Sequence, residues 1–139
     1  MARRKKSDYE GRQEYVRTMK LPPIEVWENK YPDRDYKIHL DILEFTCVCP
    51  KTGLPDFATF ELDYIPDKWC IELKSLKLYL TAYRNIGIFH EHVVNRIVDD
   101  LVAVCDPRYL KLKGIFNVRG GIRTTVEREY VRDEDSHRK

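Results

Sequence analysis

The spacing of the apolar residues divides this chain into strand-like and helix-like segments. From residue 36 to residue 49, and again over residues 57–65, apolar and polar side chains alternate as they do in half-buried strands. The alternation shifts by one position at Leu43 and Phe45, which predicts a β-bulge or a strong twist. Residues 89–105 instead carry apolar side chains at steps of three and four, the spacing of an amphipathic helix.

The remaining segments complete an order of two strands, helices and two strands. Residues 76–84 are rich in helix-forming and aromatic residues, and Asn85-Ile86-Gly87 interrupts them. Residues 109–118 and 122–130 have strand-like sequences, joined at Arg119-Gly120-Gly121, which is a hairpin signal. This order predicts an α+β fold in which an antiparallel four-stranded sheet carries two helices on one face.

Length and charge limit the organisation of the chain. Its 139 residues suffice for one domain, which we place at residues 21–130. Residues 1–20 contain a basic cluster and are expected to form a flexible arm, and residues 131–139 are expected to form a loose tail. The net charge of +2 creates no strong field toward nucleic acid, so we expect no stable nucleic-acid partner. A small open sheet has exposed edges, which favours a homo-oligomer.

Two features predict a cytoplasmic protein without a membrane partner. No apolar run approaches the roughly 20 residues of a membrane-spanning helix, and no apolar stretch follows the basic N-terminus as in a secretory signal. The four cysteines are then expected to be free thiols in a reducing compartment. Of these, Cys47, Cys70 and Cys105 are expected to pack in the core.

Several short segments, taken in their order and spacing, resemble one known family. They are residues 44–50 (EFTCVCP), 51–57 (KTGLPDF), 72–79 (ELKSLKLY), 84–85 (RN), 89–91 (FHE) and 119–121 (RGG). Together they resemble the short form of the queuosine-pathway nitrile reductases, relatives of GTP cyclohydrolase I with the tunnelling fold. The resemblance covers about residues 36–125, and residues 72–79 are its most specific segment.

The resemblance implies both a reaction and an assembly. The family reduces 7-cyano-7-deazaguanine to the 7-aminomethyl compound with two NADPH, in the biosynthesis of a modified tRNA base. Its members form pentameric rings that stack in pairs as a decamer, with active sites between subunits. By resemblance we therefore expect a tunnelling fold, a deazapurine nitrile substrate, NADPH as cofactor and a homo-oligomer.

The resemblance also assigns the reacting side chains. Cys49, directly before Pro50, matches the family's nucleophile. Its thiolate would add to the nitrile carbon to give a thioimide, whose C=N bond accepts hydride more readily than the nitrile does. Asp56 matches the family's proton donor, because each reduction requires a proton at nitrogen. By residue type alone, Cys49 could be a buried residue at a strand end and Asp56 a turn residue.

Substrate recognition needs groups that read the guanine-like edge of the base. That edge offers N–H donors, which a carboxylate accepts in pairs. Glu91 matches the family's ligand for this edge, with His90 adjacent to it. Glu72 is a further carboxylate candidate, and backbone groups from Ile71 to Leu73 are expected to help hold the base.

The cofactor requires a site of another kind. No Gly-x-Gly-x-x-Gly follows a strand, so the sequence does not support a Rossmann site. Lys74, Lys77 and Arg119 instead match the cations that bind the phosphates of NADPH in the family. We expect no metal ligands.

Three other functions stay open. An archaeal branch of the superfamily transfers ammonia to a nitrile on tRNA, but it lacks the cofactor-binding signature that this chain carries. A zinc hydrolase would use Cys47, Cys49, His90 and His92, which lack the paired spacing of a strong zinc motif. A non-catalytic RNA-binding module would use the basic N-terminal segment and the aromatic residues, although the near-neutral net charge argues against it.

Overall fold

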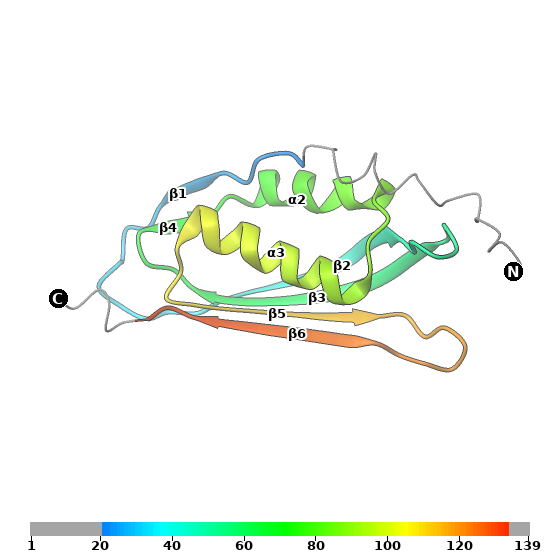
Figure 1. Cartoon of the computed structure of the whole chain (residues 1–139). Coiled ribbons are helices and arrows are strands. Elements are labelled where there is room, and N and C mark those ends of the chain that lie inside the picture. Colours follow the sequence, from blue (N-terminus) through cyan, green and yellow to red (C-terminus); the bar gives the residue numbers. More distant parts are fainter. Residues whose placement is uncertain (1–20, 134–139) are drawn as a thin grey trace, which may run out of the picture.

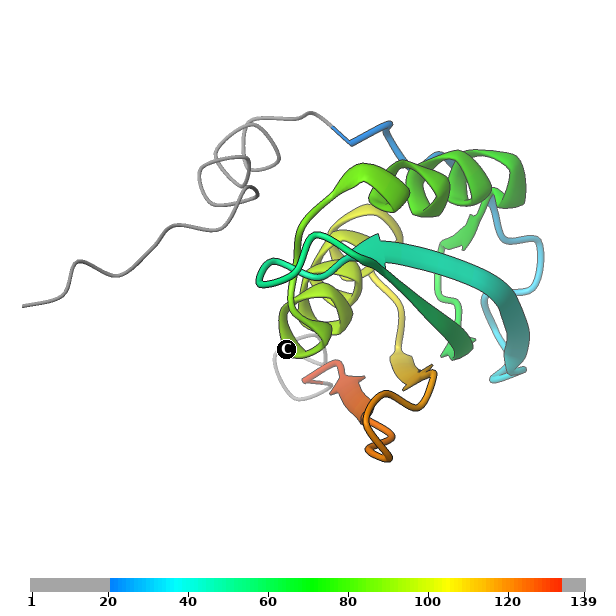
Figure 2. The same cartoon turned by 90° about the vertical axis from the view of Figure 1, so that its right-hand side faces the viewer.

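In residues 21–133, which the computed structural model describes, both helices lie on one face of an antiparallel four-stranded sheet (Figures 1 and 2). The strands follow the order β2 (Ile38–Val48), β3 (Pro55–Ile65), β5 (Tyr109–Phe116) and β6 (Thr125–Val131). A smaller sheet pairs β1 (Val26–Glu28) with β4 (Trp69–Ile71). The predicted α+β fold is therefore confirmed, and the small sheet is an addition that the periodicity did not predict.

The first helix begins earlier than the predicted residue 76. Helix α2 spans Leu73–Ala82 and continues into the short 3₁₀ helix η1 (Tyr83–Asn85). Glu72 sets its start, because its carboxylate accepts hydrogen bonds from the backbone N–H groups of Lys74 (2.9 Å) and Ser75 (2.6 Å). These contacts satisfy two of the backbone donors that a helix N-terminus leaves unpaired.

The second helix, α3 (His90–Cys105), covers the sheet with its apolar stripe. Side chains of this stripe are buried against alternate residues of the central strands, as the helical spacing predicted. The helix ends at Asp106, which adopts the left-handed conformation (φ 43°) directly before Pro107. In residues 21–133 neither helix has the length and apolar character needed to cross a membrane.

The predicted irregularity in β2 is confirmed, with one correction. The pairing register between β2 and β3 shifts between Ile42 and Phe45. Phe45 is buried and stacks on Phe60, with ring centroids 4.2 Å apart. Leu43, which the sequence pattern grouped with Phe45, is instead 70 % exposed, because the bulge turns the two side chains to different faces.

Backbone pairing joins the end of β2 to the segment between the helices. The N–H of Val48 donates to Ile86 O (2.9 Å), and the N–H of Ile88 donates to Val48 O (3.0 Å). The β2–β3 turn, the start of α3 and the β5–β6 connection consequently lie at the same end of the molecule (Figure 1). The predicted arm at residues 1–20 and residues 134–139 of the predicted tail lie outside the described residues.

Gly114 provides a test of this packing. A Cβ at this position of β5 would lie 2.8 Å from Phe60 Cε1 and 3.0 Å from Val94 Cγ2, where α3 crosses the sheet. We expect Gly114→Ala to lower the free energy of unfolding by about 1–3 kcal/mol through overpacking, measured by denaturant unfolding. Combining it with Phe60→Leu should cost less than the sum of the two single changes. An additive result would contradict the close approach.

Candidate active site

Cys49 lies in the tight turn between β2 and β3. The turn is closed by hydrogen bonds from Cys49 N–H to Leu54 O (2.9 Å) and from Gly53 N–H to Cys49 O (2.8 Å). Gly53 has φ 71°, a conformation that glycine adopts without steric cost. The turn leaves Cys49 partly exposed, whereas the other three cysteines are buried.

The surroundings of the Cys49 sulfur favour the thiolate. Partial burial raises the pKa of Cys49, but hydrogen bonds from the Thr52 hydroxyl and from the backbone N–H groups of Thr52 and Lys51 outweigh it. The pKa therefore lies below the usual value of a cysteine. A lowered pKa increases the fraction of thiolate, the nucleophilic form, near neutral pH.

The other three cysteines have a different environment. Cys47, Cys70 and Cys105 are fully buried, as predicted for core residues. Burial raises the pKa of Cys47 to about 12 and that of Cys105 to about 12. Of the four thiols, Cys49 is thus the one suited to act as a nucleophile.

Asp56 lies near the start of β3, directly after the β2–β3 turn that contains Cys49. It pairs with Cys47 in the β2–β3 register and is 5 % exposed. One carboxylate oxygen, Oδ2, lies 3.1 Å from His90 Nε2, and the other, Oδ1, lies 3.1 Å from Arg119 Nε. Residues from three distant segments thus meet at one buried carboxylate.

His90 is held in place by an aromatic ring. Its imidazole stacks on Phe116, with ring centroids 3.7 Å apart and planes 10° from parallel. Glu91 follows His90 in the first turn of α3 and is exposed. The structure thus brings together Asp56, His90 and Arg119, the last of which was assigned to the cofactor, and places the Asp56 charge close enough to add to the effect of burial in raising the pKa of Cys49.

The site residues predicted near the start of α2 do not lie close to Cys49. Glu72 caps the start of this helix, whereas the segment beyond the helix's end pairs with Val48, next to Cys49. Ten helical residues span about 15 Å, so the start of α2 is remote from the Cys49 sulfur. Ile71 is buried, and backbone donors already occupy the Glu72 carboxylate. One chain therefore does not bring these residues to Cys49.

The exposed residues of this predicted group lie at or near a separate pocket. Leu73 and Lys77 line a pocket of about 480 Å³ between α2 and the bulged part of β2. Leu73 is 56 % exposed, and Lys74 and Lys77 are both exposed cations. These side chains are thus available to a ligand or to another copy of the chain.

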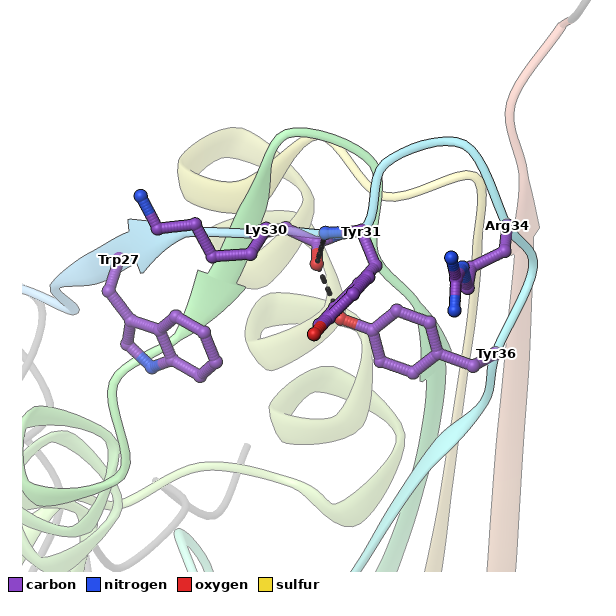
Figure 3. A pocket seen from close by; sticks show the side chains of 6 residues that line it. Trp27, Lys30, Tyr31, Arg34 and Tyr36 are labelled. Carbon is purple, nitrogen blue, oxygen red and sulfur yellow. Dashed lines mark hydrogen bonds between the residues drawn. The ribbon is translucent and has the colours of Figure 1, made fainter.

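A second hollow of about 470 Å³ lies at the connection between β1 and β2 (Figure 3). Trp27, Tyr31 and Tyr36 form its aromatic walls, and the Arg34 guanidinium lies 4.7 Å from the centre of the Tyr31 ring. It borders the start of β2, whereas Cys49 follows the end. An 11-residue strand extends roughly 35 Å, so this hollow is separate from the cysteine cluster.

Two residues at the site were not predicted from the sequence. Thr52 donates to the Cys49 sulfur, and its place in the Thr52-Gly53 turn after a cysteine could have indicated that role. Phe116 stacks on His90. This contact depends on the pairing of β3 with β5 and has no local sequence signal. Within residues 21–133 no group of three or more His, Cys, Asp or Glu side chains is arranged to hold a metal ion.

Comparison with known proteins identifies the family. The family model described as "QueF-like protein" matches residues 55–135. A protein of Nitrosococcus oceani is 61 % identical over 107 residues, which cover 77 % of this chain and 83 % of that protein. The chain belongs to the QueF-like family. The match begins at β3 and includes Asp56, His90, Glu91 and Arg119.

Other members of the QueF-like family support this assignment. A protein of Chlorobaculum tepidum is 56 % identical over 112 residues, covering 81 % of this chain and 96 % of that protein. Both relatives are named NADPH-dependent 7-cyano-7-deazaguanine reductase. The crystal structure of an archaeosine synthase QueF-Like superposes with a TM-score of 0.63 at 22 % identity, over 67 % of this chain and 91 % of that one, and shows the shared fold.

The hydroxyl of Thr52 should control the reactivity of Cys49. Thr52→Val removes a donor to the thiolate, so the pKa of Cys49 should rise and the pH profile of its alkylation by iodoacetamide should move to higher pH. At neutral pH the rate should fall roughly three- to tenfold, as expected for loss of a hydrogen bond of about 1 kcal/mol. Thr81→Val, on the exposed face of α2, is the matched control. An unchanged profile for Thr52→Val would contradict the assigned contact.

Proposed function

We propose that this chain is an NADPH-dependent reductase of 7-cyano-7-deazaguanine, in the synthesis of the tRNA base queuosine. The observation that carries the proposal is a partly exposed cysteine of lowered pKa near a buried Asp56 that contacts His90. The names of relatives about 60 % identical to this chain supply the substrate and the cofactor. Free cysteines and the absence of a spanning helix in residues 21–133 accord with a cytoplasmic location.

Cys49 performs the first step on the nitrile. Its thiolate adds to the nitrile carbon, and the nitrogen takes up a proton, which gives a thioimide. NADPH, when bound, would supply the hydride that this carbon accepts. Expulsion of the thiolate leaves an imine, and a second hydride and proton give the amine. Splitting the reduction at a covalent intermediate lowers the barrier, because the nitrile itself accepts hydride poorly.

Asp56 and His90 transfer the protons that this series of reaction steps requires. Both lie beside the turn that carries Cys49, and the stack on Phe116 fixes the imidazole. A proton donor and its partner within hydrogen-bond distance can pass protons to nitrogen as each hydride adds to carbon. Glu91 follows His90 in α3 and is exposed, so its carboxylate is available to accept the N–H donors of the purine edge.

The complete site is formed between copies of the chain. Glu72, Leu73, Lys74 and Lys77 are remote from Cys49 in one chain, so they would complete the site of a neighbouring subunit. The long strand β2 and the strand β6 are the two unpaired edges of the described four-stranded sheet, and such edges favour association. We propose that the copies form a ring, as a decamer of two stacked pentamers, with exposed Lys74 and Lys77 binding the phosphates of NADPH.

The reaction can be distinguished from amidine formation by its stoichiometry. Because reduction of a nitrile to an amine takes two hydrides, we expect about two NADPH to be oxidised per product. The oxidation is measured from the absorbance of the cofactor. Cys49→Ala should abolish this oxidation, while Cys70→Ala should retain it. Formation of an amidine from ammonia without cofactor oxidation would instead favour the tRNA-directed transferase.

A mixing experiment tests the shared site. Cys49→Ala and Lys74→Ala should each be inactive alone, because each removes one half of every site. When the two variants are unfolded together, refolded and assayed, about a quarter of the sites should contain both intact halves and recover activity. Mixing Cys49→Ala with Asp56→Asn, which impair the same half, is the matched control and should recover none. Failure of the first mixture would contradict a site made from two chains.

A further inference from the structure

Arg119 extends from a rigid turn between β5 and β6. The N–H of Arg119 donates to Ile122 O, and the carbonyl of Arg119 accepts from the N–H of Ile122, both at 2.9 Å. Gly120 (φ 57°) and Gly121 (φ 76°) form the two central positions, which need the left-handed conformation. The backbone of Arg119 is therefore fixed, while its side chain stays 48 % exposed.

The guanidinium reaches back to the first residues of β3. Its Nε lies 3.1 Å from Asp56 Oδ1, and a terminal nitrogen donates to the carbonyl of Pro55. His90 occupies the other carboxylate oxygen at 3.1 Å. Asp56 is 5 % exposed and each of its oxygens already has one partner, so departure of a partner opens space for a substrate nitrogen at that oxygen.

Arg119 is the partner that can leave. His90 is confined by its stack on Phe116, and its side chain is only 22 % exposed. The Arg119 side chain is more exposed and attaches to the carboxylate through a long flexible stem. A guanidinium binds carboxylate and phosphate with the same fork of donors, so the two anions compete for it.

We propose that Arg119 is a positioning residue that exchanges partners when the cofactor binds. It holds Asp56 while no cofactor is present, and a phosphate of NADPH then takes the guanidinium and frees Asp56 Oδ1 for the substrate. This inference rests on the proposed function, because it requires an anionic cofactor at the site. The exchange of partners couples the binding of NADPH to the release of the Asp56 carboxylate.

Thermodynamic linkage makes the exchange measurable without turnover. If binding of the cofactor must break the Arg119–Asp56 pair, removal of the Asp56 charge must strengthen that binding. We therefore expect Asp56→Asn, although inactive, to bind NADP⁺ roughly twofold to fivefold more tightly than the wild type, the scale of a partly exposed ion pair. The binding constant is measured by isothermal titration calorimetry on the full-length protein.

A double-mutant cycle separates this exchange from simple charge repulsion. In the Arg119→Gln background, Asp56→Asn should leave the affinity for NADP⁺ unchanged, because no guanidinium remains to be released. Arg123→Gln, an exposed arginine on the same connection, is the matched control and should preserve the gain. Circular dichroism of each variant checks that the fold is retained.

The outcomes also separate this inference from the proposed function. If the wild type oxidises NADPH with the nitrile, but the gain is absent or persists with Arg119→Gln, the exchange is wrong and the reductase assignment stands. If the wild type neither binds NADP⁺ nor oxidises NADPH with the nitrile, both are wrong. A gain that depends on Arg119 supports the exchange.

Discussion

The pair of backbone hydrogen bonds between Val48 and residues 86–88 is the constraint on which the site depends. It holds the end of β2 against the segment that leads into α3. Together with the Asp56–His90 contact, it keeps the turn carrying Cys49 beside the start of the helix that carries His90. Because the contact uses backbone groups, it specifies position with little demand on side-chain identity.

Asp56 places a buried carboxylate at that end of the molecule. A buried carboxylate is costly unless its oxygens are paired, and here His90 and Arg119 pair them. Phe116 supports the imidazole from the next strand, so sheet register determines the geometry of the pair. Burial and the Asp56 charge raise the pKa of Cys49, and the hydrogen-bond donors of the Cys49 turn outweigh both, so that the pKa of this thiol is lowered.

Periodicity predicted the elements better than it predicted their contacts. The four strands and α3 followed from alternation and the helical stripe, because each buries one face. The start of α2 was missed since it depends on a cap by Glu72, a residue that the resemblance assigned to the substrate. Leu43 was misplaced because a bulge changes which face a residue occupies.

Site residues close in sequence or strand pairing could be anticipated, whereas those joined by tertiary contacts could not. Cys49 and Asp56 flank one hairpin turn, so their proximity followed from the expected strands. The Arg119–Asp56 and His90–Phe116 contacts require the register of β3 with β5, which no local pattern encodes. That is why Arg119 was assigned to the cofactor alone.

The central claim is that the Cys49 sulfur bonds to the nitrile carbon, and intact-protein mass spectrometry tests it most directly. The protein is mixed with 7-cyano-7-deazaguanine in the absence of NADPH, and the modified peptide is then located. The account predicts a mass increase equal to the whole nitrile, since addition expels no atom, confined to the peptide that contains Cys49. An unmodified Cys49 in protein that still turns over the nitrile, or an adduct on another residue, would contradict it.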